Sequence, residues 1–199
     1  MARSIVKEGK FFKVYDDGCV RIDMVRASYP HLDKPWAKNE GDNAKFSITG
    51  LGDKDTHDAA KSALVEIINK LCLEKKFGKL GSDKKFIRNG DDAGGEENEN
   101  MWVIKASENP KRPPKLRSRN GSTISPSEVE AIIYPGCYVN ILIRPWAQDS
   151  KEWGKRINAN LIAVQFWEDG ERFGEAPIDD EGVFDEADDG MGGVEDDDL

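Results

Sequence analysis

The amino-acid sequence predicts a mainly β fold, a small barrel of strands with one α-helix inserted between them, followed by an acidic C-terminal segment. Several segments alternate apolar and polar residues with a period of two, which is typical of half-buried strands. A single longer segment has apolar residues at helical spacing. The negative charge of the chain is concentrated at its C-terminal end.

Six segments have the composition and alternation of strands. We expect strands over residues 11–15, 19–27, 44–50, 101–107, 137–144 and 159–167. In the second of them, Val20, Ile22 and Met24 lie on one face and charged residues lie on the other. Turns rich in Asp and Gly follow at residues 16–18 and 168–170. Because nearly all of the predicted elements are strands, the segments favour a barrel over a layered α/β fold.

The one predicted helix covers residues 57–77. Asp53, Asp55 and Thr56 precede it and are residues that favour a helix start, and Gly78 provides a stop. The apolar positions at helical spacing are Ala60, Leu64, Ile67, Ile68 and Leu71. A single apolar stripe of this kind predicts that the helix packs on the barrel as a cap and does not contact a ligand.

The charges divide the chain into two parts. The sequence has 29 Lys and Arg against 38 Asp and Glu, a net charge of -9. Residues 175–199 contain twelve of these carboxylates and no Lys or Arg, so residues 1–174 have 29 basic against 26 acidic side chains, a net of +3. Such a dense run of like charges cannot bury enough apolar surface to fold. We therefore predict a folded domain over residues 1–174 and a disordered acidic tail over residues 175–199.

Several classes of protein do not fit the sequence. The three cysteines, Cys19, Cys72 and Cys137, are widely separated and odd in number, which argues against a disulfide framework or a zinc site and favours a reducing cytoplasm. No stretch has the ~20 apolar residues of a membrane helix. The N-terminal residues lack the apolar segment of a secretory signal. We expect a soluble cytoplasmic protein with no membrane contact.

No motif predicts catalysis, a metal or a cofactor. The run of Asp53, Asp55, His57 and Asp58 resembles a metal cluster, but carboxylates at a helix start are already explained by capping and by the helix dipole. The chain has no phosphate-binding Gly-Lys-Ser/Thr loop, no nucleophile elbow and no telling Cys–His spacing. The sequence thus predicts a protein that is not an enzyme.

Basic and aromatic residues are interspersed along the predicted strands and loops. Proteins that bind single-stranded nucleic acid use this pair of residue types, because cations neutralise phosphates and flat rings stack on bases. The aromatic residues in these regions are Tyr29, Trp36, Trp102, Tyr138, Trp146 and Trp153. The residues that we predict to bind DNA are Arg26, Arg88, Trp102, Lys105, Lys111, Arg112, Lys115, Arg117, Arg119, Tyr138, Arg144, Trp146, Lys155 and Arg156. For any single aromatic residue, a place in the core or at its rim is the alternative.

One part of this set is a basic, proline-containing segment, residues 111–119. Such a segment packs poorly in a core and suits a flexible clamp on phosphates. An ordinary solvated loop and a localisation signal are the alternatives.

The acidic tail also contains residues that favour protein contacts, namely Phe184, Asp196, Asp197, Asp198 and Leu199. Because the tail compensates an otherwise cationic domain, we expect it to compete for the nucleic-acid site and to bind partner proteins through its acidic, apolar end. A solvated tail without a partner is the alternative.

Four segments resemble a family of bacteriophage single-stranded-DNA-binding proteins. They are residues 26–32 (RASYPHL), 86–92 (FIRNGDD), 134–140 (YPGCYVN) and 160–174 (NLIAVQFWEDGERFG). The resemblance runs in order through residues 20–175. It implies an OB fold, a five-stranded Greek-key barrel, that coats single-stranded DNA during phage replication, recombination or repair in the cytoplasm of a bacterial host. The layout is also similar to single-strand binders whose acidic tails end in an apolar residue, often Phe, where this chain has Leu199.

The sequence as a whole predicts a non-enzymatic protein that coats single-stranded DNA without sequence specificity. Its expected partners are single-stranded DNA and, through the tail, replication or recombination proteins, and the sequence is compatible with a homo-oligomer. Two alternatives belong to other classes: a metal-dependent nuclease of the same replication module, and an acidic protein-interaction module.

Overall fold

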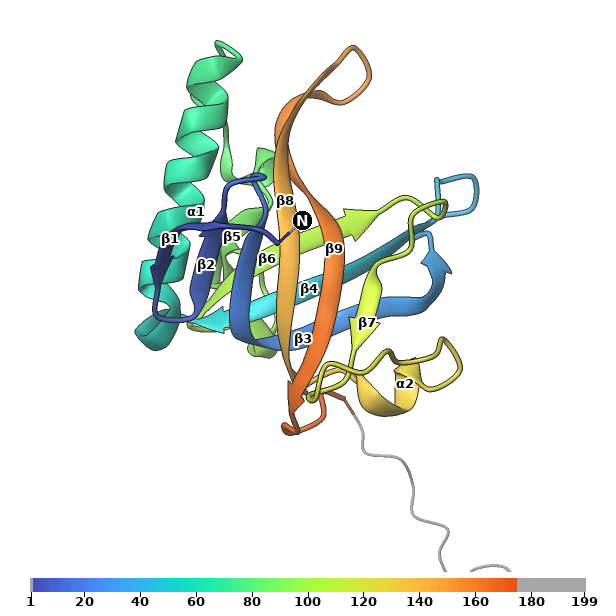
Figure 1. The fold of residues 1–199 in the computed structure, drawn as a ribbon. Coiled ribbons are helices and arrows are strands. Elements are labelled where there is room, and N and C mark those ends of the chain that lie inside the picture. Colours follow the sequence, from blue (N-terminus) through green and yellow to red (C-terminus); the bar gives the residue numbers. More distant parts are fainter. Residues whose placement is uncertain (1, 175–199) are drawn as a thin grey trace, which may run out of the picture.

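Alternating apolar residues form the strands of a barrel in the computed structural model, which describes residues 2–174 (Figure 1). The strands are β1 (Ile5–Gly9), β2 (Phe12–Tyr15), β3 (Val20–Trp36), β4 (Lys45–Asp53), β5 (Ile87–Asn89), β6 (Met101–Glu108), β7 (Lys115–Arg117), β8 (Tyr138–Ser150) and β9 (Gly154–Glu168). The helices are α1 (Lys54–Glu74) and the short α2 (Val129–Ile132), and single 3-10 turns lie at Ser82–Lys84, Gly90–Asp92 and Glu96–Asn98.

Five of the strands close into a barrel. β3 pairs antiparallel with β4 and with β8, β4 pairs with β6, and β8 pairs with β9. The barrel closes where β6 meets β9 in parallel, at Ser107 and Asn160. In chain order the barrel strands therefore run first–second–third–fifth–fourth around the barrel, which is the Greek-key order of the OB fold. The predicted mainly β barrel with an inserted helix is confirmed.

The inward-facing residues of the strands form one core. The largest fully buried side chains of the barrel strands are Val20, Ile22, Ile48, Leu51, Ile104, Ile141, Ile143, Ile157 and Leu161. In β8, Val139, Ile141 and Ile143 are buried and Arg144 is exposed, as a half-buried strand requires, but Asn140 on the other face is buried as well. Burying such side chains contributes roughly 1.5–3 kcal/mol each, so the core is the main source of the barrel's stability.

The helix α1 is inserted between β4 and β6 and packs its apolar stripe on the core, with Ala60, Leu64 and Ile68 buried. It lies three residues earlier than the predicted 57–77. The Asp53 carboxylate caps the helix by accepting the backbone N–H of Asp55 at 2.7 Å, so the helix begins at Lys54. The helix ends before the predicted stop at Gly78, and the residue in the left-handed conformation after it is Lys76, with φ 54°.

The structure corrects several predicted strand features. Met24 has φ 57° at a bulge in β3, so the buried position after Ile22 belongs to Val25. The strands β1, β5 and β7 were not predicted. The segment 11–15 forms β2 in a hairpin with β1, beside the barrel and not in it. β8 and β9 extend well beyond the predicted ends as a two-stranded arm, which rises at the top of Figure 1.

Two polar connections between the strands contain regular structure. The residues 89–100 include two 3-10 turns, and Asp91 ties them down by pairing with Lys54 and accepting the backbone N–H of Asn100. The basic segment contains β7, whose Leu116 is buried against β9. The predicted tail, residues 175–199, lies outside the described residues, and the boundary at residue 174 stays a prediction.

Candidate nucleic-acid interface

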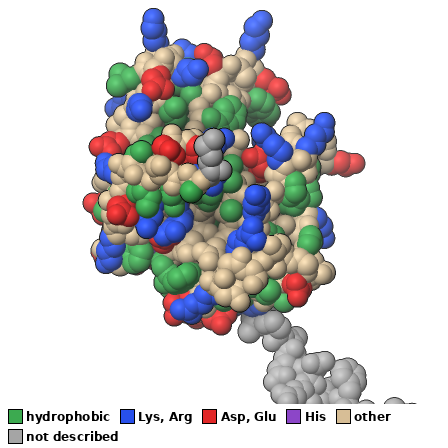
Figure 2. All heavy atoms as spheres, in the orientation of Figure 1, with side chains coloured by type: hydrophobic (Ala, Val, Ile, Leu, Met, Phe, Trp, Pro, Cys, Tyr) green, Lys and Arg blue, Asp and Glu red, His purple; other side chains and the backbone are tan. Residues whose placement is uncertain are grey.

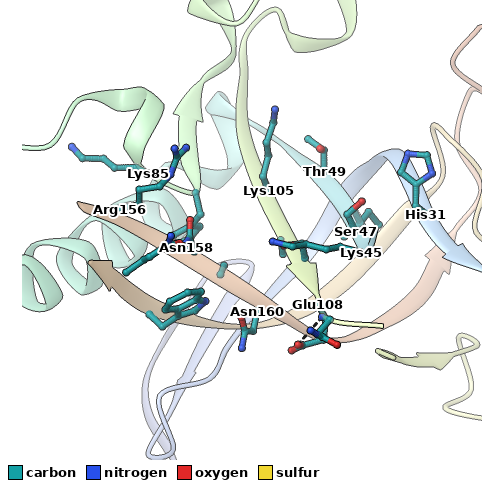
Figure 3. Close-up of a pocket in the computed structure, with 18 of the residues that line it drawn as sticks. His31, Lys45, Ser47, Thr49, Lys85, Lys105, Glu108, Arg156, Asn158 and Asn160 are labelled. Atoms are coloured by element: carbon teal, nitrogen blue, oxygen red, sulfur yellow. Dashed lines mark hydrogen bonds between the residues drawn. The ribbon is translucent and has the colours of Figure 1, made fainter. Parts of the chain in front are cut away.

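A groove of about 1180 Å³ lies along the outer face of β4 and β6, the second and third strands of the barrel (Figure 3). The loop between β3 and β4 borders it on one side, and the arm formed by β8 and β9 borders it on another. In OB folds this barrel face and these two connections form the surface that binds oligonucleotides and oligosaccharides. We call it the groove below.

The groove is strongly basic. Its lining includes eight Lys and Arg side chains, Lys38, Lys45, Lys84, Lys85, Arg88, Lys105, Arg112 and Arg156. Glu108 is the one carboxylate among the lining residues. It is buried, accepts the backbone N–H of Asn109 at 2.8 Å and pairs with Arg112 at 3.1 Å, so it is already satisfied within the protein. The groove thus concentrates positive potential where little acidic charge opposes it.

The positive charges of the groove act on one another. Desolvation lowers the pKa of the Lys105 ammonium, and the nearby charges of Arg88 and Lys38 lower it further. The Arg88 Nε is buried and has no hydrogen-bond partner among residues 2–174. The mutual repulsion of these cations falls when a polyanion binds beside them.

Four aromatic side chains surround the cations. Their exposed fractions are 68% for Tyr29, 48% for Trp36, 39% for Trp146 and 58% for Trp153. Trp36 stacks on His31 with ring centroids 4.5 Å apart and planes 6° apart. Burial lowers the pKa of His31, and the charge of Asp33 opposes this shift. Flat, exposed rings beside a basic surface are suited to stacking on unpaired bases.

Tyr29 has a strained backbone. Its φ is 45°, in the left-handed region that residues other than glycine rarely adopt, and it lies where the register of β3 against β4 shifts between Ser28 and His31. The bulge directs an otherwise unsupported ring into the groove. Strain of roughly 1–3 kcal/mol at such a residue is typical of functional sites.

The arm contributes one face of its hairpin to the groove. Trp146 pairs with Asn158 and Gln148 pairs with Arg156 across the two strands, and all four line the groove. The Asn158 amide donates to the Gln148 side chain at 2.6 Å. The arm also rests on the segment before β5, because Arg156 Nη2 donates to the carbonyl of Asp83 at 2.9 Å.

The groove collects five of the fourteen residues that we predicted to bind DNA. They are Arg88, Lys105, Arg112, Trp146 and Arg156. Figure 3 labels two of them, Lys105 from β6 and Arg156 from β9. Their contacts with DNA stay predictions.

The other nine predicted residues lie outside the groove. Lys111 and Lys115 are exposed on the basic segment, and Lys155 stands 5.3 Å from the Phe77 ring. The remaining six make contacts within the protein, as follows: Arg26 with Tyr138, Trp102 with Lys54 and Lys61, Arg117 with Thr123, Arg119 with Trp167, and Arg144 with Asp17.

Among these nine residues, Arg26 differs most clearly from the cations of the groove, because its guanidinium contacts the protein itself. Its guanidinium donates to the carbonyls of Gly136 and Glu171 at 3.2 and 2.5 Å and lies 4.2 Å from the Phe173 ring. These contacts fasten residues 168–174 to the end of the barrel opposite the arm (Figure 1). The geometry gives Arg26 a structural role.

The sequence reasoning missed several lining residues, namely His31, Lys38, Lys45, Ser47, Thr49, Lys84, Lys85, Phe86, Asn158 and Asn160. It noted Tyr29, Trp36 and Trp153 as aromatic companions but did not select them as site residues. Their aromatic type was a usable signal. Isolated lysines and polar strand residues carry no such signal, because they occur on any solvated face.

The residues that resembled a metal cluster form the start of α1. His57 is buried, stacks on Phe11 at 4.7 Å and hydrogen-bonds the carbonyl of Asp23 through Nε2 at 2.8 Å. Within residues 2–174, no group of three or more His, Cys, Asp and Glu side chains is arranged to hold a metal ion. In the same range no helix is long and apolar enough to cross a membrane.

The closed Greek-key barrel and the basic, aromatic groove on its second and third strands define an OB-fold protein, the class whose barrels bind oligonucleotides and oligosaccharides. The family described as Enterobacter phage Enc34, ssDNA-binding protein, matches residues 19–195 of the chain. The chain therefore belongs to this family, which confirms the resemblance found in the sequence.

Solved structures agree with this assignment. The single-stranded DNA-binding protein from bacteriophage Enc34 is 39% identical, with a TM-score of 0.79 over 93% of this chain and 100% of that chain. The same phage protein in complex with ssDNA is 40% identical, with a TM-score of 0.80 over 86% of this chain and 98% of that chain. The single-stranded DNA-binding protein gp2.5 of bacteriophage T7 is 11% identical with a TM-score of 0.54 over 85% of this chain and 96% of that chain, and shares the fold.

Proposed function

We propose that this protein binds single-stranded DNA without sequence specificity and coats and protects it, without catalysing a reaction. The observation that carries this proposal is the groove, where eight basic side chains and four exposed aromatic rings share the OB barrel face. The relative of known structure in complex with ssDNA supports the choice of ligand.

The groove chemistry favours single strands over duplex. Lys45, Lys85 and Lys105 neutralise phosphates, while Tyr29 and the tryptophans stack on bases that a duplex would hide. Stacking contributes about 1–3 kcal/mol per base and tolerates any base, because every base has a flat face. Lysine ammonium groups likewise contact the phosphates, which are common to all sequences.

The biological setting and the role of the tail are part of the proposal. The protein acts during phage DNA replication, recombination or repair in the cytoplasm of a bacterial host. Residues 175–199 compete with DNA for the groove and, once released, recruit replication or recombination proteins. The twelve carboxylates of this segment and the basic groove support this competition.

Fluorescence anisotropy of a labelled oligo-dT, with duplex DNA as competitor, tests the proposal on the full chain and on residues 1–174. We expect preference for the single strand, weaker binding in salt, and tighter binding at low salt when residues 175–199 are removed. Unchanged affinity without the tail would refute the competition. No binding by either protein would refute the function and favour an acidic interaction module, whereas loss of the oligonucleotide in Mg²⁺ or Mn²⁺ would favour a nuclease.

A further inference from the structure

A second cavity, of about 510 Å³, lies on the outer face of β8 and β9, away from the groove. Figure 2 shows this face, with Lys and Arg side chains on both sides of a hollow near its centre. Arg3, Arg21 and Arg117 line the cavity, and none of its lining residues is Asp or Glu. Its floor consists of polar and apolar strand residues, including Asn140 and Leu142.

Each of these arginines is held in place and keeps free donors. Arg117 Nη1 donates to the Thr123 hydroxyl at 2.6 Å, while Arg3 pairs with Asp17 at 2.6 Å and Arg21 pairs with Asp23. A guanidinium has five N–H donors, so most of them stay available. Arg144 also contacts Asp17, so two arginines share that one carboxylate.

Two chain segments connect this cavity to the groove. Along β9, Asn160 lines the groove, and Ala163 and Gln165 line the second cavity, about 10–17 Å further at ~3.3 Å per residue. The basic segment runs alongside, because β7 pairs in parallel with β9 (Figure 1). Within it, Arg112 lines the groove and Arg117 lines the second cavity.

We propose that the second cavity binds the phosphodiester backbone of single-stranded DNA that leaves the groove along the basic segment. This rests on the proposed function and adds a phosphate subsite formed by Arg3, Arg21 and Arg117. The exposed Lys115 lies between Arg112 and Arg117 in the chain. Arginine suits this role because its planar fork of donors matches phosphate oxygens.

The geometry favours a nucleic-acid strand over the acidic segment 175–199 of this chain. Both are anionic, but only a strand already in the groove would meet Arg112, Lys115 and Arg117 in succession. Deleting residues 175–199 distinguishes these two occupants.

The first test is the salt dependence of wild-type binding to two oligo-dT lengths, about 8 and about 16 nucleotides, within the range of one OB fold. Both are measured under conditions where one protein binds one oligonucleotide. Three added phosphate contacts make the slope of log K against log salt steeper by about 2 for the longer strand. Equal slopes would overturn the second site and leave the groove intact. Failure of the wild type to bind either length would overturn the proposed function as well.

The second test is Arg117→Glu in the full chain, with Lys70→Glu as the control for net charge, since Lys70 is exposed on α1 and lines neither cavity. We expect Arg117→Glu to weaken binding of the longer strand about tenfold, with less than about a twofold change for the shorter one. Lys70→Glu should change neither. Arg117→Lys, which keeps the charge, should restore most of the loss.

Two results would overturn the proposal. One is an equal loss for both strand lengths, which would place the effect of Arg117→Glu in the groove or in the fold. The other is an effect that disappears when residues 175–199 are deleted, which would assign the cavity to the acidic segment. If Arg117→Glu does not fold, the difference between the two wild-type salt slopes still shows whether the second cavity binds DNA.

Discussion

Two regions of this molecule are rich in the same residue types but use them differently. In the groove, lysines and arginines stand beside exposed aromatic rings without stacking on them, and Lys45, Lys85 and Lys105 have no ion pair among residues 2–174. At the end of the barrel opposite the arm, each cation stacks on a ring, Arg26 on Phe173 and Arg172 on Tyr134.

The difference shows that composition alone does not identify a binding surface. A guanidinium that stacks on a ring and donates to backbone carbonyls already uses its donors within the protein. Removing it therefore lowers the free energy of unfolding. An unpaired cation in a groove stabilises the fold little and is available to a ligand. The two roles are distinguished by whether a cation is already paired within the protein, and not by its residue type.

The largest expected effect comes from reversing charge in the groove. Lys45→Glu combined with Lys105→Glu should weaken binding of oligo-dT about 1,000-fold at low salt and make the salt slope shallower by about 1.4, because two phosphate contacts are lost and replaced by repulsion. Both side chains are exposed, so the unfolding midpoint should change little. A salt titration by anisotropy measures the effect, and a loss below tenfold would contradict the assignment of the groove.

The converse effect is expected at the opposite end of the barrel. Arg26→Ala should lower the free energy of unfolding by roughly 2–4 kcal/mol, since two carbonyls lose a charged donor and the Phe173 ring loses its cation. Urea unfolding measures this loss. Affinity for oligo-dT at a temperature where the variant is folded should stay within twofold, and a large loss of affinity at full stability would return Arg26 to the DNA-binding set.

Tyr29 and Met24 offer a smaller and more specific comparison, because both are non-glycine residues with positive φ on β3, but only Tyr29 lines the groove. Asparagine tolerates this backbone conformation. Tyr29→Asn should weaken binding about tenfold, because one stacking ring is lost. The matched control Met24→Asn should leave affinity unchanged. Equal effects of the two variants on affinity would contradict a stacking role for Tyr29.

The smallest expected effect is a dependence on pH. Burial lowers the pKa of His31 in the free protein, and a bound phosphate would raise it, so DNA binding is coupled to proton uptake. Affinity should therefore rise about threefold as pH falls from about 7.5 to about 5.5, across the ordinary histidine pKa of about 6.5. His31→Gln should flatten this profile relative to the wild type, and an unchanged profile would exclude His31 as the source.

The sequence predicted the barrel well where its strands are half-buried. The alternation at Val20 and Ile22 in β3 and at Val139, Ile141 and Ile143 in β8 persists because these side chains pack in the core, and it breaks at the Met24 bulge. The arm was missed because residues 148–156 extend past the core, and since none of them is buried, no buried face imposes a pattern there. β7 was missed because Leu116 is the only apolar residue in a basic, proline-containing segment.

The sequence by itself determined the class of fold, the position of the helix and the separation of positive and negative charge along the chain. These follow from local patterns, namely period-two alternation, helical spacing and runs of carboxylates. The tertiary structure decided which basic and aromatic residues face the groove. Closure of the barrel brings together four distant segments, residues 29–49, 84–88, 105–112 and 146–160. Whether a cation there is free or paired depends on contacts between strands far apart in the chain, which no local pattern encodes.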